Sequence, residues 1–231
     1  RRGAPTVAST LGNVPSVLIG DFWLVKAMCA VLDGADGQDR VIRIFSRTLS
    51  DLAEGEMLQL QKAALADTGE EDYFEIIYRK TASLFAATSL SAAISVNASE
   101  DVEQAAADFG KYLGLAFQIR DDIFDYMPES GIGKPVGVDI VEKKITLPLL
   151  CAFGNAGKDE EMKIREKIKD GGKGVRDEVI AFVRENGGIQ KAQEILEEYI
   201  GKAIGVTGVF PRSRDRELLV CLAETLSHRT V

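Results

Sequence analysis

The feature that most constrains this chain is a stretch, residues 117–126, in which three aspartates interrupt an apolar helical run. Asp121 and Asp125 are four residues apart and share a helix face, whereas Asp122 is turned about 100° from Asp121. Burying ionised carboxylates is unfavourable unless a cation or hydrogen bonds compensate. The stretch therefore predicts a hard divalent cation such as Mg²⁺, which takes carboxylate and phosphate oxygens as ligands. The preceding residues Leu113, Leu115, Ala116, Phe117 and Ile119 form the apolar run.

A solvated acidic face is the alternative interpretation of this D-D-x-x-D spacing, and the short motif alone does not separate the two. The apolar flanks favour the buried metal site. His228 is the only histidine in the chain and lies in a polar tail. Histidine-based zinc sites and Ser-His-Asp or Cys-His catalysis are therefore not expected.

Composition narrows the class of protein further. The chain has 231 residues, 45% of them apolar, which suits one large domain or two small ones. Its net charge of −8 argues against nucleic acid as a partner. The cysteines, Cys29, Cys151 and Cys221, are widely spaced, as expected of reduced thiols in a cytoplasmic protein. We expect no transmembrane segment, because no apolar run reaches the length of a membrane span.

The pattern of apolar residues predicts an all-α fold, with no period-two alternation and no hairpin signal. Thr68 and Glu71 form a capping-box pattern, and Ser99 is expected to cap a further helix. Gly55 falls inside a predicted helix, which indicates the close approach of a neighbour. The helices are expected at residues 17–32, 38–66, 68–96, 99–127, 146–153, 160–169, 174–185, 189–203 and 212–229.

Residues 83–95 are rich in alanine, serine and threonine. This pattern is compatible with close packing of helices, the commoner cause, or with a wall of small side chains that leaves room for a channel. The Gly131–Lys134 tetrapeptide follows a predicted helix instead of a strand, and the full phosphate-loop pattern is absent, so a nucleotide-binding fold is rejected.

Taken jointly, these motifs resemble those of the trans-prenyltransferases, the polyprenyl diphosphate synthase family. The resemblance runs along almost the whole chain and depends on motifs in a fixed order. Lys143 departs from the family pattern, which usually has glycine there. The matching segments are residues 1–6, Gly20-Asp21, and residues 54–59, 80–85, 117–125, 133–139 and 144–148.

The resemblance implies an isoprenoid-synthase helical bundle with a central active-site cavity, usually a homodimer. It also implies one polyprenyl synthase domain over residues 1–231. The first aspartate-rich motif of the family and the helices before it are not in this sequence, and we expect them in the gene. The implied reaction joins isopentenyl diphosphate to an allylic diphosphate, head to tail, with Mg²⁺ and with Mn²⁺ as a substitute.

The resemblance also assigns roles by position. Asp121, Asp122 and Asp125 would hold the metal. Lys80, Asp121 and Lys134 would be catalytic. Phe85 and Thr88, one and two turns beyond Thr81, would line the hydrocarbon channel. Gln59 and Asp139 would contact the residues that bind substrate or metal, without binding either themselves. The substrate-binding residues would be Arg1, Arg2, Lys80, Thr81, Gln118, Lys134 and Lys144.

Two other functions remain open at this stage: a terpene cyclase with the same bundle, and a non-catalytic regulatory subunit of a heteromeric synthase. The Lys80-Thr81 pair, the Lys134 segment and the Arg1-Arg2-Gly3 opening favour chain elongation. The small residues at 83–95 predict a medium or long product, of about octaprenyl length.

Overall fold

A computed structural model describes residues 4–33, 38–127, 136–172 and 174–228. Arg1, Arg2 and Lys134 lie outside these ranges. Within them every regular element is a helix, as the sequence predicted. The elements are α1 (Val7–Leu11), α2 (Asn13–Leu32), α3 (Gln38–Leu65), α4 (Glu70–Ile77), the π-helix η1 (Tyr78–Ala82), α5 (Ser83–Ser95), α6 (Glu100–Phe124), α7 (Val138–Val141), α8 (Leu147–Asn155), α9 (Lys158–Asp170), α10 (Val175–Glu185), α11 (Gly188–Val206), the 3₁₀ helix η2 (Thr207–Val209) and α12 (Arg214–His228).

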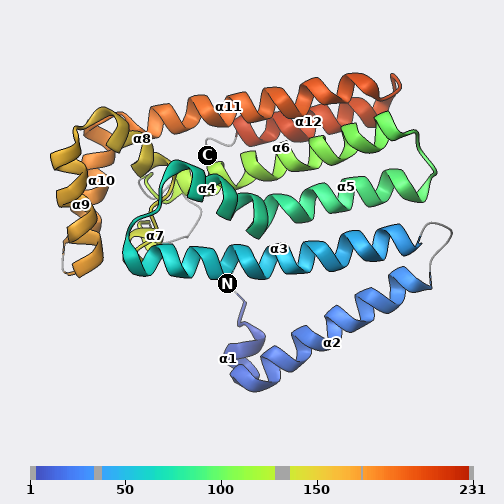
Figure 1. Ribbon diagram of the computed structural model, residues 1–231, viewed down its shortest axis with the longest axis horizontal. Coiled ribbons are helices and arrows are strands. Elements are labelled where there is room, and N and C mark those ends of the chain that lie inside the picture. The colour runs from blue at the N-terminus through green and yellow to red at the C-terminus, as the bar shows by residue number, and fades with distance from the viewer. Residues whose placement is uncertain (1–3, 34–37, 128–135, 173, 229–231) are drawn as a thin grey trace.

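Long helices that lie side by side form the main bundle (Figure 1). Helix α6 is at its centre, with α5 and η1 packed on one side and α11 on the other. Phe109, Ile119 and Leu196 belong to the core between these helices, which also receives α4, α8 and α12. This packing buries Leu113, Leu115, Ala116 and Ile119 of α6, as the apolar run predicted, whereas Phe117, also expected in the core, is 38% exposed.

A second core lies at one end of the bundle, where α8, α9 and α10 gather (Figure 1). Leu149 of α8, Ile168 of α9 and Val183 of α10 are almost fully buried in it. Tyr126, just after α6, joins the same cluster. The second core therefore fixes the end of α6 against the start of α8.

The long helix predicted from residue 68 to residue 96 is three elements, because a π-helical turn, η1, separates α4 from α5. The predicted Thr68–Glu71 capping box was wrong by one residue: α4 begins after Gly69, whose N–H donates to Asp72 Oδ2 at 2.9 Å. Ser99 is the N-cap residue of α6, as predicted, but its side chain makes no capping hydrogen bond.

Two glycines on neighbouring helices allow η1 to pack closely from both sides. A Cβ added to Gly55 of α3 would lie 2.7 Å from the Lys80 backbone nitrogen, and one added to Gly114 of α6 would lie 2.6 Å from Ala82 Cα. Both distances are too short for a side chain. The close approach predicted at Gly55 is therefore confirmed, and α5 also packs closely where Gly110 meets Phe85.

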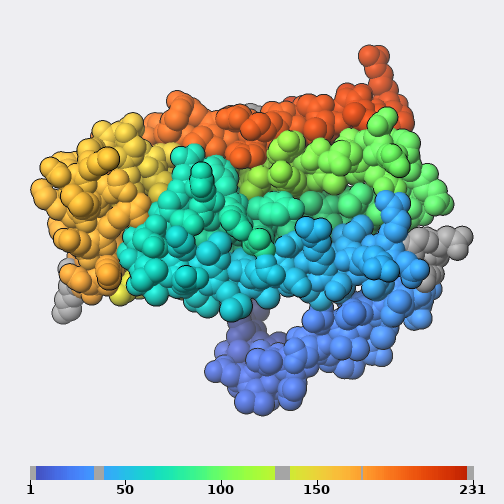
Figure 2. All heavy atoms as spheres, in the orientation of Figure 1, coloured from blue at the N-terminus to red at the C-terminus, as the bar shows by residue number. Residues whose placement is uncertain are grey.

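Helix α2 has no buried residue. Together with α1 it forms an arm that lies apart from the bundle (Figure 1). The space-filling view shows open space between this arm and the rest of the molecule (Figure 2). By length and composition α2 is the one helix in the described ranges that could cross a membrane, whereas the sequence had predicted no apolar run of that length. Its exposed side chains include Val14, Val17, Leu18, Phe22, Trp23 and Val25.

Candidate active site

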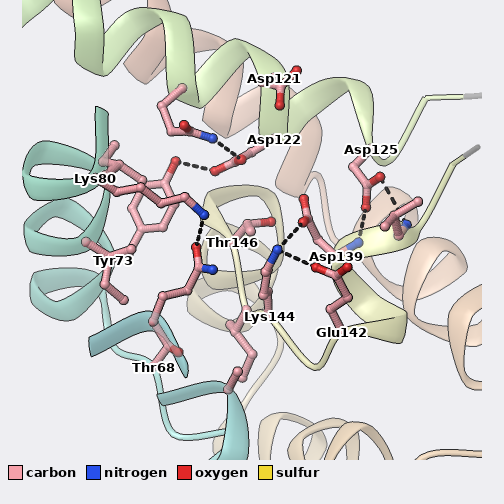
Figure 3. Close-up of a pocket in the computed structure, with 17 residues that line it drawn as sticks. Thr68, Tyr73, Lys80, Asp121, Asp122, Asp125, Asp139, Glu142, Lys144 and Thr146 are labelled. Carbon is pink, nitrogen blue, oxygen red and sulfur yellow. Dashed lines mark hydrogen bonds and ion pairs between the residues drawn. The ribbon is translucent and has the colours of Figure 1, made fainter. Parts of the chain in front are cut away.

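A cavity of about 580 Å³ opens beside the second half of α6 (Figure 3). Its walls come from α3, from α4 with η1, from α6, and from the segment that contains α7 and the start of α8. The lining residues are Gln59, Ala63, Thr68, Tyr73, Ile76, Ile77, Lys80, Gln118, Asp121, Asp122, Asp125, Val138, Asp139, Glu142, Lys144, Ile145 and Thr146. The cavity thus joins five of the segments that matched the family motifs in the sequence, residues 54–59, 80–85, 117–125, 133–139 and 144–148.

The three aspartates of α6 line the same cavity but differ in their surroundings. Asp121 is partly exposed, whereas Asp122 and Asp125 are each only 4% exposed. The helical spacing places Asp125 one turn beyond Asp121, as Figure 3 shows. Because of this difference in burial, Asp122 and Asp125 depend on hydrogen bonds from the protein more than Asp121 does.

Asp122 accepts a hydrogen bond on each carboxylate oxygen. The Tyr73 hydroxyl donates to Oδ2 at 2.8 Å, and Gln118 Nε2 donates to Oδ1 at 2.9 Å. Burial, and then the charge of Asp139, raises the pKa of Asp122 to about 7, although these two hydrogen bonds act in the opposite direction. Burial and the neighbouring Asp122 also raise the pKa of Tyr73 well above its usual value, so its hydroxyl remains a donor.

Asp125 organises the chain that follows the aspartate motif. Its Oδ1 accepts the Val138 N–H at 3.1 Å and its Oδ2 accepts the Asp139 N–H at 3.0 Å. Its backbone carbonyl accepts the Gly137 N–H at 2.9 Å. These bonds cap the first turn of α7, since the N–H groups there have no helical partner. Both carboxylate oxygens thus serve the fold.

Lys80 reaches the cavity from η1, which packs beside α6 (Figure 3). Its ammonium donates to Gln59 Oε1 at 3.0 Å and lies 2.9 Å from Glu56 Oε2, both on α3. The side chain is 34% exposed, so solvent and ligands can reach it. Gln59, predicted to support the site, is thus in direct contact with Lys80.

Lys144 supplies a second positive charge, between α7 and α8. Its ammonium is paired with Glu142 and lies 3.4 Å from Asp139 Oδ1. Burial lowers its pKa, but the hydrogen bond and charge of Glu142, together with Asp139, produce a net increase. Lys144 is therefore charged at neutral pH, on the opposite wall from Lys80.

Thr81 and Gln118 form a direct pair, because the Thr81 hydroxyl donates to Gln118 Oε1 at 3.0 Å. The two predicted channel residues do not line this cavity. The Phe85 ring packs against the Phe117 ring with centroids 5.7 Å apart. Thr88 is exposed, and its hydroxyl donates to the Leu84 carbonyl. The structure therefore brings together Lys80, Thr81, Gln118, Asp121, Asp122, Asp125 and Lys144, and places Phe85 and Thr88 further along α5.

Tyr73, Glu56 and Glu142 also belong to the site, although the sequence predicted no role for them. Tyr73 precedes Lys80 by seven residues, which places both side chains on one helix face, so its position could have been inferred from Lys80. The position of Glu142 could not be inferred from helical spacing, because its pairing with Lys144 depends on the turn after α7.

The donors of this cavity suit a hard cation such as Mg²⁺. In the described part of the chain, no group of three or more acidic, histidine or cysteine side chains is placed to hold a metal by itself. The candidate ligands that line the cavity are carboxylate oxygens, chiefly of Asp121 and Asp139. Mg²⁺ commonly takes one or two carboxylates and completes its shell with water and substrate phosphates, so these residues fit it.

The sequence model of the family described as "Polyprenyl synthetase" matches residues 1–185. The chain belongs to this family. The predicted family, helical fold and prenyltransferase class are thus confirmed. Among relatives of this synthetase, the octaprenyl diphosphate synthase of Haemophilus influenzae is 37% identical over 227 residues, which cover 96% of this chain and 68% of the relative. The octaprenyl diphosphate synthase of Escherichia coli is 36% identical over 231 residues, covering 99% of this chain and 71% of the relative.

Solved structures of related synthases have the same fold. A polyprenyl synthase from Caulobacter crescentus, complexed with calcium and isoprenyl diphosphate, matches with a TM-score of 0.86 and 32% identity over 99% of this chain and 70% of that one. A decaprenyl diphosphate synthase from Rhodobacter capsulatus has the same TM-score and identity, over 100% of this chain and 71% of that one.

Proposed function

We propose that this polyprenyl synthetase condenses an allylic diphosphate with isopentenyl diphosphate, head to tail, to make a medium- or long-chain polyprenyl diphosphate. The observation that carries the proposal is the distribution of charge in the cavity. Lys80 and Lys144 stand on two walls, and Asp121 lies on a third (Figure 3). This pattern suits an anionic diphosphate that binds partly through ammonium groups and partly through a cation shared with a carboxylate.

In the proposed reaction, the bond between the allylic carbon and its diphosphate breaks, and the isopentenyl double bond attacks the resulting cation. A proton then leaves the new chain, with the released diphosphate as its acceptor. Lys80 and Lys144 would stabilise the charge that develops on the leaving group. The pairing of each lysine with an acidic residue holds its ammonium at the cavity before substrate arrives.

Asp121 would hold the divalent cation, with Asp139 nearby and the substrate phosphates as further ligands. When bound, such a cation would neutralise charge on the departing diphosphate. The related Caulobacter crescentus synthase was solved with calcium and isoprenyl diphosphate, which supports a site for a hard cation beside a diphosphate. We propose Mg²⁺ here, with Mn²⁺ as a substitute. Arg1, Arg2 and Lys134, outside the described residues, remain proposed substrate ligands.

We also propose that the synthetase is a cytoplasmic homodimer and that residues 1–231 form a single domain. The helix α2 supports a dimer, since it exposes many apolar side chains and none of its residues is buried in the described chain. The three cysteines are free thiols, which is typical of a reducing compartment. Helix α11 packs along α6 and α8, which joins the C-terminal helices to the bundle that carries the site.

The test is incorporation of labelled isopentenyl diphosphate by the complete protein, with farnesyl diphosphate and Mg²⁺, followed by separation of products by length. A ladder that ends at one length is the expected result. Lys80→Ala should reduce incorporation strongly, because a charge that acts on the leaving group is worth roughly 100-fold or more in kcat. A folded protein that incorporates nothing from allylic substrates of several lengths would overturn the proposal and favour a regulatory subunit or a cyclase.

A further inference from the structure

Tyr73 is a buried tyrosine whose hydroxyl bonds to a carboxylate of the aspartate motif. The residue is 2% exposed, belongs to the main core and also lines the cavity. Its hydroxyl lies 2.8 Å from Asp122 Oδ2 (Figure 3). A phenylalanine ring would fill the same space. The contribution of the hydroxyl beyond packing is therefore its hydrogen bond to Asp122.

A line of hydrogen bonds passes from η1 through α6 to α4. The Thr81 hydroxyl orients the Gln118 amide, Gln118 donates to Asp122, and Tyr73 donates to the other oxygen of the same carboxylate. Gln118 lies on the same helix as Asp122, one turn earlier. Tyr73 is therefore the donor that joins this carboxylate to a different helix.

We infer that Tyr73 is a positioning residue that acts through Asp122, holding this carboxylate at the cavity wall beside Asp121. The inference rests on the proposed function, since it concerns the place where the diphosphate and its cation would bind. Without the hydroxyl, the buried Asp122 carboxylate would retain a single donor from its own helix and could rotate away from the cavity wall. This rotation would displace the negative charge beside Asp121.

The test is Tyr73→Phe in the complete protein, which keeps the ring and removes the hydroxyl. Loss of a partner that orients a metal-site carboxylate typically costs about 10–100-fold in metal affinity or activity. We expect a decrease of that size in kcat, a higher Mg²⁺ requirement and an unchanged KM for isopentenyl diphosphate. Calorimetric titration of Mn²⁺ in the presence of inorganic diphosphate should show weaker binding by a similar factor.

Tyr126→Phe is the matched control. Tyr126 is also fully buried, and its hydroxyl accepts a hydrogen bond from Thr146 at 3.3 Å instead of donating to Asp122. This variant should keep the kinetics and Mn²⁺ affinity of the wild type. Equal losses in both variants would show that removal of any buried hydroxyl disturbs the site, which would overturn the inference.

A double-mutant cycle tests whether Tyr73 acts through Asp122. Adding Tyr73→Phe to Asp122→Asn should cause no further loss, measured by calorimetry if turnover is too slow. The inference is wrong if Tyr73→Phe causes the same loss in both backgrounds, or none in the wild type. A wild-type protein that binds Mn²⁺ and diphosphate but incorporates no isopentenyl diphosphate would contradict the proposed function, while the binding cycle would still decide the role of Tyr73.

Discussion

Gly55 on α3 faces the backbone of Lys80 on η1 so closely that a Cβ at Gly55 would lie 2.7 Å from the Lys80 nitrogen. The Lys80 ammonium in turn bonds to Gln59, one turn beyond Gly55 on the same helix. One helix therefore determines both the backbone position and the side-chain direction of this lysine. A π-helical turn is frequent at functional sites, and here it carries Lys80 and Thr81 together.

Replacement of Gly55 by alanine should displace η1, because the new methyl group would meet backbone atoms. We expect a destabilisation of roughly 1–3 kcal/mol, as for other overpacked sites, and a higher KM for the allylic diphosphate. Gly201→Ala is the control: Gly201 is in helix α11 with open space around its Cβ position. That variant should be as stable as the wild type or gain up to about 1 kcal/mol. Thermal unfolding and steady-state kinetics would measure both effects.

Substitutions of the aspartates of α6 should differ in their effects on stability and on activity. Asp125→Asn places an amide N–H group against a backbone N–H, and should destabilise the fold by about 1–3 kcal/mol. Asp121→Asn should leave the unfolding midpoint almost unchanged and remove most Mg²⁺-dependent activity. Urea unfolding and incorporation assays on both variants would check this, and a large loss of stability in Asp121→Asn would contradict it.

The stability of the protein without divalent cations should depend on pH through Asp122. Its pKa is raised from 3.8 to about 7 in the folded state, chiefly by burial. Between these values the folded state retains a proton that the unfolded state has lost. The free energy of unfolding should therefore fall as the pH rises from about 4 to about 7, by up to about 1.4 kcal/mol per pH unit. Above this range the contribution of Asp122 should stay constant.

Asp122→Asn provides the comparison, because an amide does not titrate in this range. Urea unfolding of both proteins at several pH values should show the fall in unfolding free energy that Asp122 causes in the wild type alone. Identical pH profiles would mean that Asp122 does not titrate with a raised pKa. Mg²⁺ with diphosphate should reduce the decline if the cation favours the ionised carboxylate.

The sequence placed the three aspartates of the cavity on one helix because their signals are local. Asp121, Asp122 and Asp125 follow one another on a single helix, and their apolar flank predicted the burial of Asp122 and Asp125, although Asp121 is partly exposed. The separate roles of Asp122 and Asp125 could not be predicted, since the donors to these residues come from Tyr73 on another helix and from the backbone of residues 138 and 139. The π-turn was also missed, because its sequence continues an ordinary helical pattern and the wide turn depends on packing against α3 and α6.

Thr88→Phe tests the channel wall on α5 that the sequence predicted. Thr88 is exposed, one turn beyond Leu84, so a larger ring can be placed there without disturbing the core. Products should become shorter while the rate of the first condensation remains similar, as chain-length analysis would show. Thr88→Val, which removes the hydroxyl without adding a ring, should leave the products unchanged. An active Thr88→Phe enzyme with unchanged products would remove this part of the proposal.

Helix α2 should be needed for the proposed dimer. Leu18 and Val25, 62% and 57% exposed, are seven residues apart and share one helix face. A Leu18→Glu, Val25→Glu double variant should shift the protein toward the monomer in analytical ultracentrifugation. Met162→Glu, on the exposed surface of α9, is a control that should not change the mass. A wild type that sediments as a monomer, or a double variant that remains dimeric, would count against an interface on α2.

Asp125 has one more consequence, for how related chains can vary. The chain leaves α6 at this residue and returns to it at Gly137 and Val138, so the start and the end of the connection are bonded to each other. The relative position of α6 and α7 is thereby set by these bonds and not by the number of residues between them. Insertions or deletions within residues 128–133, before Lys134, should therefore leave the spacing of Asp121, Asp139 and Lys144 unchanged, so a related chain can differ in length here and keep the same cavity.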